Sequence, residues 1–183
     1  YSSAASDVYK RQASDLTTLN ERVVLGLFTW NDYSFQTQAN SEVDVEFSKW
    51  NNAADSFLLT YSVQPVWFSN PAPYPERTRH VAMQVSKLKN VCTHVMYWSP
   101  DIVRWDSYEG PNPSGAKIAS WSYDKNNITR RKIEGSRTSN PVVIPAPEDS
   151  THARMNLWLL NGLGPSNNKE VEVIIKSFNY IPL

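Results

Sequence analysis

The sequence predicts an all-β domain built as an antiparallel β-sandwich, and three features lead to this fold class. Short runs rich in β-branched and aromatic residues recur along the chain, with turn residues between them. No stretch shows the 3.6-residue apolar spacing of an amphipathic helix, and no internal repeat is found. Aromatic residues make up 12% of the chain, with 7 Trp, 9 Tyr and 6 Phe, which suits a sandwich core.

The predicted strands follow from apolar runs and from the residues that end them. The first run ends at the turn formers Asn31 and Asp32, and the third stops at Pro65, which cannot donate to a central ladder. Ser99-Pro100-Asp101 favours a type I turn, so the strands on either side of it form a hairpin. Residues 66–75 and 126–139 are predicted loops. Strands are predicted at residues 22–30, 42–50, 56–64, 80–86, 93–98, 102–107, 118–123, 154–160 and 170–179.

Length and composition limit what the chain can be. Its 183 residues and 20.9 kDa are enough for one well-buried domain and too few for two comfortable ones. Lys+Arg and Asp+Glu each number 18, and this balance argues against nucleic acid and anionic membranes as partners. No apolar run reaches the length of a membrane span. The single cysteine, Cys92, rules out an internal disulfide and a cysteine-based metal site.

The first twelve residues (YSSAASDVYKRQ) resemble a peptide translated from sequencing-adapter DNA. They contain neither a starting Met nor the hydrophobic region of a signal peptide. We therefore expect residues 1–12 to be a non-native, unpacked tail and 13–183 to be a single domain that lacks its first strands. Such a domain is expected to expose unpaired sheet edges, with poor solubility or weak activity as the consequence.

Three acids alternate with apolar residues in one predicted strand. Because side chains alternate between the two faces of a strand, Glu42, Asp44 and Glu46 lie on one face and the residues between them pack into the core. A solvated strand face would have the same pattern. Paired carboxylates are also what glycoside hydrolysis needs, one as nucleophile and the other as acid and then base. The pattern alone leaves both interpretations open.

Four segments together resemble glycoside hydrolase family 16, the laminarinase and lichenase-type enzymes. Residues 41–47 (SEVDVEF) resemble the family's E-I-D-I-E-F catalytic strand, and 25–30 (LGLFTW) resemble the apolar strand before it. Residues 93–101 (THVMYWSPD) are similar to the H-T-Y-x-x-x-W-x-P-D hairpin. Residues 154–158 (RMNLW) are similar to the late M-N-L-W strand. The likeness runs through residues 23–182 in the expected order.

The resemblance implies a concanavalin A-like jelly roll that cleaves internal β-glycosidic bonds of a polysaccharide, such as a β-glucan, with retention. It implies that Glu42 is the nucleophile, Glu46 the acid/base and Asp44 the assisting carboxylate. Four residues of strand separate the Cα atoms of the two glutamates by about 13 Å. Side chains that lean inward can close the carboxyl gap to the roughly 5–5.5 Å of a retaining enzyme. Expected substrate-binding residues are Asn156, Trp158, His94, Tyr61 and Gln64.

Partners and location follow from the same resemblance. The expected partner is a polysaccharide, the complete protein is expected to be a monomer, and its location is extracellular or periplasmic. Two alternatives stay open: a non-catalytic, lectin-like carbohydrate-binding domain, and a transglycosylase on the same fold. The three acids favour an enzyme, since a lectin does not need them.

The chain also departs from the family pattern. Asn40 stands where lichenase-type members often have a tryptophan that stacks on sugar. The calcium site of many members uses an acid near the aromatic of the final strand, where this chain has Ser177 before Phe178. We therefore expect no cofactor, and the sequence does not support a structural calcium ion. His80 and His152 have no partner at ligand spacing, so no other metal is expected.

Overall fold

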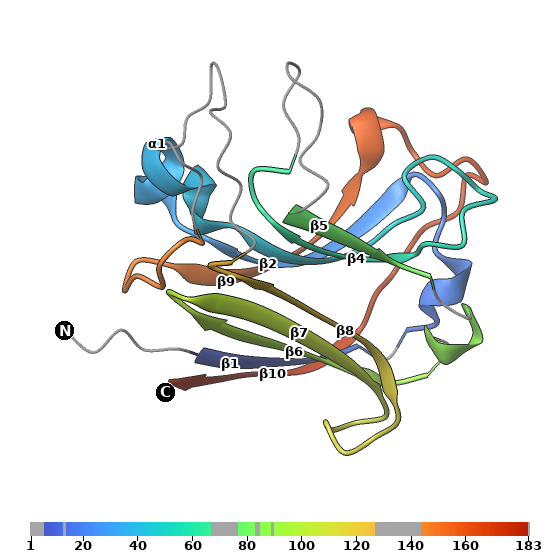
Figure 1. Cartoon of the computed structure of the whole chain (residues 1–183). Coiled ribbons are helices and arrows are strands. Elements are labelled where there is room, and N and C mark those ends of the chain that lie inside the picture. Colours follow the sequence, from blue (N-terminus) through green and yellow to red (C-terminus); the bar gives the residue numbers. More distant parts are fainter. Residues whose placement is uncertain are drawn as a thin grey trace.

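The computed structural model describes residues 6–12, 14–66, 77–82, 85–88, 90–126 and 144–182. In this part of the chain the fold is all-β, with two five-stranded antiparallel sheets that lie face to face (Figure 1). The order of one sheet is β10-β1-β6-β7-β8, and the order of the other is β5-β4-β3-β2-β9. The all-β, sandwich-like fold predicted from the sequence is thus confirmed.

The strands of the first sheet are β1 (Ser6–Gln12), β6 (Cys92–Ser99), β7 (Ile102–Glu109), β8 (Lys117–Asp124) and β10 (Ile175–Pro182). Those of the second are β2 (Val23–Trp30), β3 (Val43–Phe47), β4 (Leu59–Val63), β5 (Thr78–Val81) and β9 (His152–Leu159). The helical elements are short: η1 (Leu16–Thr18), η2 (Asp32–Ser34), α1 (Phe35–Gln38), η3 (Ala39–Ser41), η5 (Val85–Leu88) and η6 (Leu160–Gly162). Among the described residues, no helix is long and apolar enough to cross a membrane.

Most predicted strands overlap an observed one, and the differences lie at their ends. The predicted strand 80–86 divides into the end of β5 and the 3₁₀ turn η5. The closing strand begins at Ile175 rather than at 170, and it extends to Pro182. The hairpin around Ser99-Pro100-Asp101 is present as β6 and β7. The predicted loops fall mostly outside the described residues.

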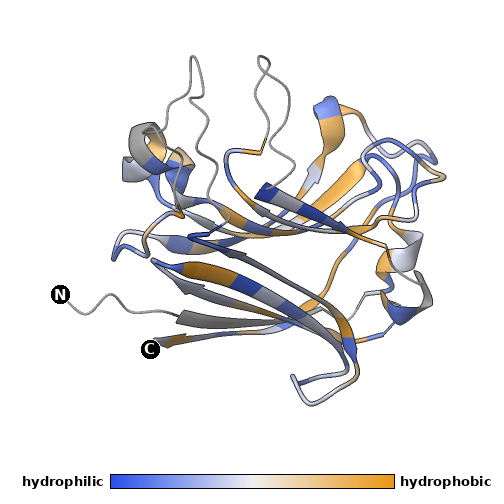
Figure 2. Cartoon of the chain, in the orientation of Figure 1, coloured by the Kyte–Doolittle hydropathy of each residue, from blue (hydrophilic) through white to orange (hydrophobic). Residues whose placement is uncertain are grey.

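The core lies between the two sheets. Val43, Val45 and Phe47 of β3 are all buried, as the alternating pattern predicted. The ring of Trp105 on β7 stacks on that of Tyr61 on β4, with ring centroids 5.7 Å apart, so aromatic contacts join the sheets. β2 is hydrophobic along most of its length (Figure 2) because it is a central strand of its sheet.

The segment Ser6–Gln12 corrects one expectation. It forms β1, which pairs with β10 on one side and β6 on the other. The prediction that residues 1–12 would be unpacked is therefore wrong for this part of the segment. Its resemblance to an adapter-derived peptide had led us to leave it out of the fold, but the backbone of any residue except proline can supply both sides of a sheet ladder.

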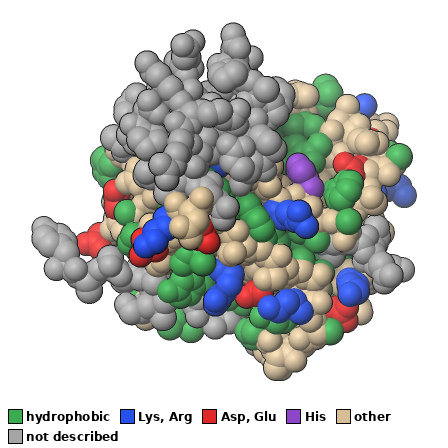
Figure 3. All heavy atoms as spheres, viewed as in Figure 1, with side chains coloured by type: hydrophobic (Ala, Val, Ile, Leu, Met, Phe, Trp, Pro, Cys, Tyr) green, Lys and Arg blue, Asp and Glu red, His purple; other side chains and the backbone are tan. Residues whose placement is uncertain are grey.

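Two edge strands leave apolar side chains accessible. Within the described residues, β9 ends one sheet and β10 ends the other, which matches the expectation of an edge at the closing strand. Leu157 and Leu159 of β9 are each 40% exposed, and Phe178 of β10 is 39% exposed. Elsewhere on the described part of the face shown in Figure 3, charges of both signs are interspersed, in keeping with the zero net charge.

Candidate active site

A pocket of about 320 Å³ opens on the outer face of the second sheet. The three acids predicted as catalytic all line it. They come from one side of the pocket, on β3 and the residue just before it, while β2 forms the centre and β9 the opposite side. The lining residues are Gly26, Phe28, Trp30, Glu42, Asp44, Glu46, Arg154, Asn156 and Trp158.

Strand register explains why these side chains meet. Gly26 of β2 pairs with Glu46 on β3 and with Asn156 on β9. Paired residues of neighbouring strands point to the same face, so Glu46 and Asn156 stand on either side of a glycine. Asn156 and Trp158 therefore lie where the sequence placed them, in the same pocket as the acids.

A tight turn delivers Glu42 to this face. Ala39, Asn40 and Ser41 have consecutive left-handed backbones, with φ of 48°, 63° and 52°. Asn40 is buried, and its side-chain amide donates to the backbone oxygen of Asn31 at 3.2 Å. Asparagine is among the residues that best tolerate this backbone region. Asn40 therefore holds the turn before the acids and is not placed to stack on a sugar.

The carboxylate of Asp44 is held in a fixed position. It accepts hydrogen bonds from the hydroxyl of Ser62 at 2.7 Å and from the side-chain amide of Gln64 at 3.2 Å. The backbone N–H of Gln64 also donates to the backbone oxygen of Glu42 at 3.0 Å. Gln64, which we expected to bind substrate, instead positions two of the acids and does not line the pocket.

A buried arginine supports Gln64 in turn. Arg77 is fully buried, and its guanidinium donates to the backbone oxygens of Gln64 at 2.8 Å and Val63 at 2.9 Å. It also donates to the hydroxyl of Tyr123 at 3.0 Å. A buried charge is tolerated only when it is hydrogen-bonded, so these contacts fix the end of β4 beneath the acids.

Burial and mutual repulsion change the ionisation of the two glutamates. Burial, together with the charges of Asp44 and Glu46, raises the pKa of Glu42 to about 10. Burial and the charge of Asp44 raise the pKa of Glu46 to about 8. Because ionising one carboxyl makes ionising the other harder, the two glutamates lose their protons in separate steps, and a singly protonated pair lies between these steps. This singly protonated pair is the state that acid-assisted attack by a carboxylate requires.

The same causes, burial and the charge of Asp44, raise the pKa of both glutamates, so these shifts do not distinguish the nucleophile from the acid. The resemblance assigns the ionised nucleophile to Glu42. Pocket electrostatics therefore support a proton-sharing pair, while the division of roles within it rests on the resemblance.

Gly26 provides the space for this arrangement. A Cβ atom built on Gly26 would lie 2.5 Å from the side-chain oxygen of Asn156, well inside van der Waals contact. The absence of a side chain at this position lets Asn156 extend over the pocket floor toward Glu46. Gly26 thus belongs to the site because its lack of a side chain lets the Asn156 amide lie close to the backbone of β2.

We expect Gly26→Ala to displace the Asn156 amide and to lower kcat/KM on any substrate by up to about 10²-fold, because small misplacements of positioning groups have effects of this size. Steady-state kinetics measure the loss, and circular dichroism checks the fold. Gly164→Ala is the matched control, since its Cβ would meet nothing within 4 Å. Unchanged kinetics in Gly26→Ala would show that Asn156 does not act in the reaction.

Aromatic side chains close the pocket at both ends. Trp158 lines one end and contacts Trp50, with ring centroids 6.4 Å apart. Trp30 lines the other end and contacts Phe28 edge-to-face at 6.2 Å. Flat apolar rings beside hydrogen-bonding groups suit sugars, which have apolar faces and polar edges.

Two predicted substrate-binding residues lie elsewhere, and their placement contradicts the expectation. Tyr61 is fully buried between the sheets, where its hydroxyl is 2.6 Å from the hydroxyl of Ser107. His94 is buried on β6, with its Nδ1 atom 2.8 Å from the same Ser107 hydroxyl and its ring against Phe47. Tyr61 pairs with Val45, a core residue of β3, so both side chains must face the core.

Four pocket residues were not predicted as site residues: Gly26, Phe28, Trp30 and Arg154. A signal for Arg154 was present, because two-residue alternation from Asn156 places both on one face of the strand. Phe28 and Trp30 also share a face of β2 by alternation, but no predicted site residue on that strand marked this face as the one in the pocket. The signal for Gly26 is the pairing of β2 with both neighbours, which a single sequence does not reveal.

Neither a metal site nor a known relative identifies the function of this pocket. Among the described residues, no group of three or more His, Cys, Asp or Glu side chains is arranged to hold a metal ion. The sequence matches no protein-family model, no curated protein and no solved structure.

Proposed function

We propose that this chain is a retaining, endo-acting glycoside hydrolase that cleaves β-glycosidic bonds in a polysaccharide such as a β-glucan. The observation that supports this function is the clustering of Glu42, Asp44 and Glu46 in one pocket with aromatic ends. The raised pKa values of both glutamates support it further. The two antiparallel sheets are compatible with a concanavalin A-like jelly roll, which we propose as the finer description of the fold.

In the proposed reaction, Glu46 donates its proton to the glycosidic oxygen while the Glu42 carboxylate attacks the anomeric carbon. The bond between that carbon and the leaving oxygen breaks, and an ester to Glu42 forms. Glu46, now ionised, takes a proton from a water molecule that attacks the same carbon, and the ester bond breaks to release Glu42. Two displacements at one carbon give retention of configuration. From the family resemblance, we propose an extracellular or periplasmic location.

The first test is hydrolysis of a panel of β-1,3-glucan, β-1,4-glucan and β-galactan, with products followed by reducing-end assay and NMR. We expect internal cleavage of at least one polymer and a β-configured first product. Binding of a polymer without cleavage would favour the lectin-like alternative. Transfer to an added sugar acceptor faster than to water would favour the transglycosylase.

A second test uses the charge of Asp44. After burial, this charge is the next largest cause of the raised pKa of both Glu42 and Glu46. Asp44→Asn removes this charge, so both pKa values fall. Ionisation of the nucleophile then occurs at lower pH, and loss of the acid's proton also occurs at lower pH. Both limbs of the kcat/KM profile should therefore move toward acid, with a smaller loss of activity than in Glu42→Ala.

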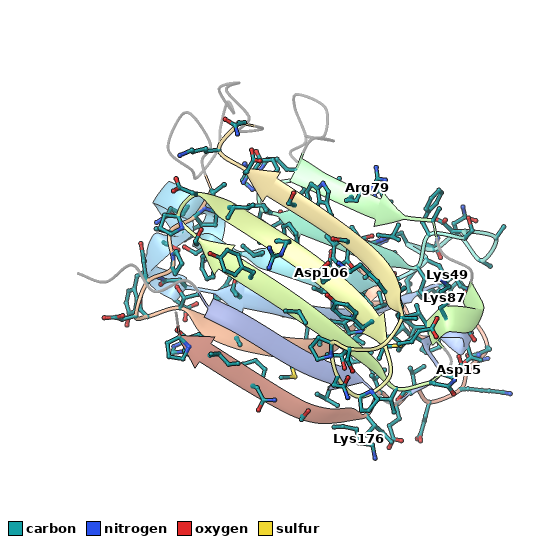
Figure 4. All side chains as sticks on the ribbon, turned by 60° about the horizontal axis from the view of Figure 1, so that its bottom comes forward. Asp15, Lys49, Arg79, Lys87, Asp106 and Lys176 are labelled. Atoms are coloured by element: carbon teal, nitrogen blue, oxygen red, sulfur yellow. The ribbon has the colours of Figure 1, made fainter. Side chains whose placement is uncertain are left out.

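The pH profile of Asp106→Asn is the control for this test. Asp106 lies on the outer face of the other sheet, where it pairs with Lys117 at 2.7 Å (Figure 4). Its removal should leave both limbs in place. Limbs that move toward alkaline pH in Asp44→Asn would contradict the proposed electrostatics.

A further inference from the structure

Arg154 is the one cationic residue among those that line the pocket. It lies on β9, two residues before Asn156 and four before Trp158, so all three share a face. Its register partner on β2 is Phe28, which pairs in turn with Asp44 on β3. Arg154 thus stands across the pocket from the carboxylates, on the side formed by β9.

Arg154 belongs to a cluster at the rim of the pocket, the rim cluster, made of Trp30, Asp32 and Arg154. The Asp32 carboxylate accepts a hydrogen bond from the Trp30 indole at 2.7 Å and one from the Arg154 guanidinium at 3.3 Å. The guanidinium carbon lies over the Trp30 ring, 5.8 Å from its centroid. The cluster therefore combines an aromatic ring with a cation that its neighbours hold in place.

The ion pair within this cluster is weak and can be replaced. The side chains of Arg154 and Asp32 are 44% and 68% exposed, and exposed pairs of this kind contribute little to the stability of a protein. A guanidinium has five N–H donors, of which one has an acceptor among the described residues. Carboxylates and sulfates suit such a planar donor group because they can accept two hydrogen bonds at once.

The acids of the pocket repel an anion less strongly than three ionised carboxylates would. Burial raises the pKa values of Glu42 and Glu46, so the pocket carries fewer negative charges than three free carboxylates would. The negative charge nearest to Arg154 in the described structure is that of Asp32, which already pairs with it. An anionic group at the rim would thus meet a cation with limited repulsion from the acids.

We propose that the rim cluster is a subsite for a sugar unit that carries an anionic substituent, a sulfate ester or a carboxylate, with the anion on Arg154. This inference rests on the proposed action on polysaccharides and narrows it to an acidic polymer. The anion replaces Asp32 as the acceptor for the guanidinium, and Trp30 supplies an apolar contact for the sugar ring.

The experiment measures binding of soluble polysaccharides to the full chain carrying Glu42→Ala, so that the polymer stays intact. The probes are a sulfated galactan, the same galactan after chemical desulfation, and a uronate-containing galactan. We expect Arg154→Gln to weaken binding of an anionic polymer by about 10- to 100-fold, the effect of losing a charge-assisted hydrogen bond. Affinity for the desulfated polymer should not change. The arm that shows the loss identifies sulfate or carboxylate as the recognised group.

Two further variants separate anion binding from support of Trp30. Asp32→Asn removes the competing carboxylate, so this variant should keep or strengthen binding of the anionic polymer. If Asp32 and Arg154 only supported Trp30, Asp32→Asn would instead weaken the binding of all polymers alike. Arg154→Lys keeps the charge without the planar donor group and should bind with intermediate affinity. Arg104→Gln is the matched control. Arg104 pairs with Asp106 at 3.5 Å and lies over the Tyr97 ring, on the other sheet.

Equal losses of affinity for charged and desulfated polymers in Arg154→Gln would overturn the subsite. Equal affinity for charged and desulfated polymers in the chain that keeps Arg154 would also overturn it. The proposed function fails separately. A chain that binds acidic polymer through Arg154 but cleaves no polymer, with Glu42 intact, would keep the subsite and refute the hydrolase.

Discussion

Glu42→Ala is expected to abolish hydrolysis, because no glycosyl ester can form without the nucleophile. Sodium azide should then restore turnover of an activated glycosyl fluoride, since a small anion can occupy the space left by the side chain. The restored reaction is a single displacement, so the glycosyl azide should have the inverted anomeric configuration. Rates from fluoride release and product configuration from NMR provide the measurement.

The same experiment decides the division of roles between the glutamates. The pocket raises the pKa of both glutamates, so the assignment of the nucleophile to Glu42 rests on the resemblance. If azide restores an inverted product in Glu46→Ala and not in Glu42→Ala, the two roles are exchanged. Glu109→Ala, at the end of β7 in the other sheet, is the control and should keep full activity.

The second large effect is expected for Glu46→Ala. General acid help contributes about 10²- to 10⁴-fold, so natural polysaccharides with poor leaving groups should lose activity by this amount. Activated aryl glycosides need no proton on the leaving oxygen, so their first step should stay close to the parent rate. The ester to Glu42 would then accumulate, which appears as a burst of released phenol followed by slow turnover. An equal loss on both kinds of substrate would contradict the acid role.

The fold class and the shared face of the three acids could be predicted because both depend on local alternation. In residues 42–47 the period of two separates the acids from the core residues without reference to any other strand. Alternation also places Asn156 and Trp158 on one face of β9, while their assignment to the site came from the family resemblance. Their convergence with Glu46 depends on Gly26, and that pairing is a property of the sheet.

Predictions failed where the face of a strand depends on a partner. Tyr61 and His94 were assigned to the pocket, but register places Tyr61 beside Val45 in the core, and Ser107 binds both side chains there. The irregular segment between β3 and β4 hides that register from a single sequence. Gln64 failed differently, because it lies close to the acids but donates its amide to Asp44. Hydrogen bonding of this kind has no sequence pattern.

The segment Ser6–Gln12 was misjudged because its resemblance to an adapter-derived peptide was taken as a reason to leave it out of the fold. Its pairing with β6 and β10 is a backbone ladder, which nearly any sequence can supply. Exposed apolar residues on β9 and β10 show that side-chain burial is incomplete at these two edge strands.

We propose that a carboxylate of this pocket forms a covalent bond to the sugar. Incubation with 2-fluoro-glycosides that have good leaving groups, in gluco and galacto series, should inactivate the chain by trapping that ester. Mass spectrometry of the digested protein should then find the added sugar on the peptide that contains Glu42, and Asp44→Asn should still form the adduct. If the chain turned over the matching non-fluorinated substrates but formed no adduct on Glu42 or Glu46, the proposed covalent mechanism would be contradicted.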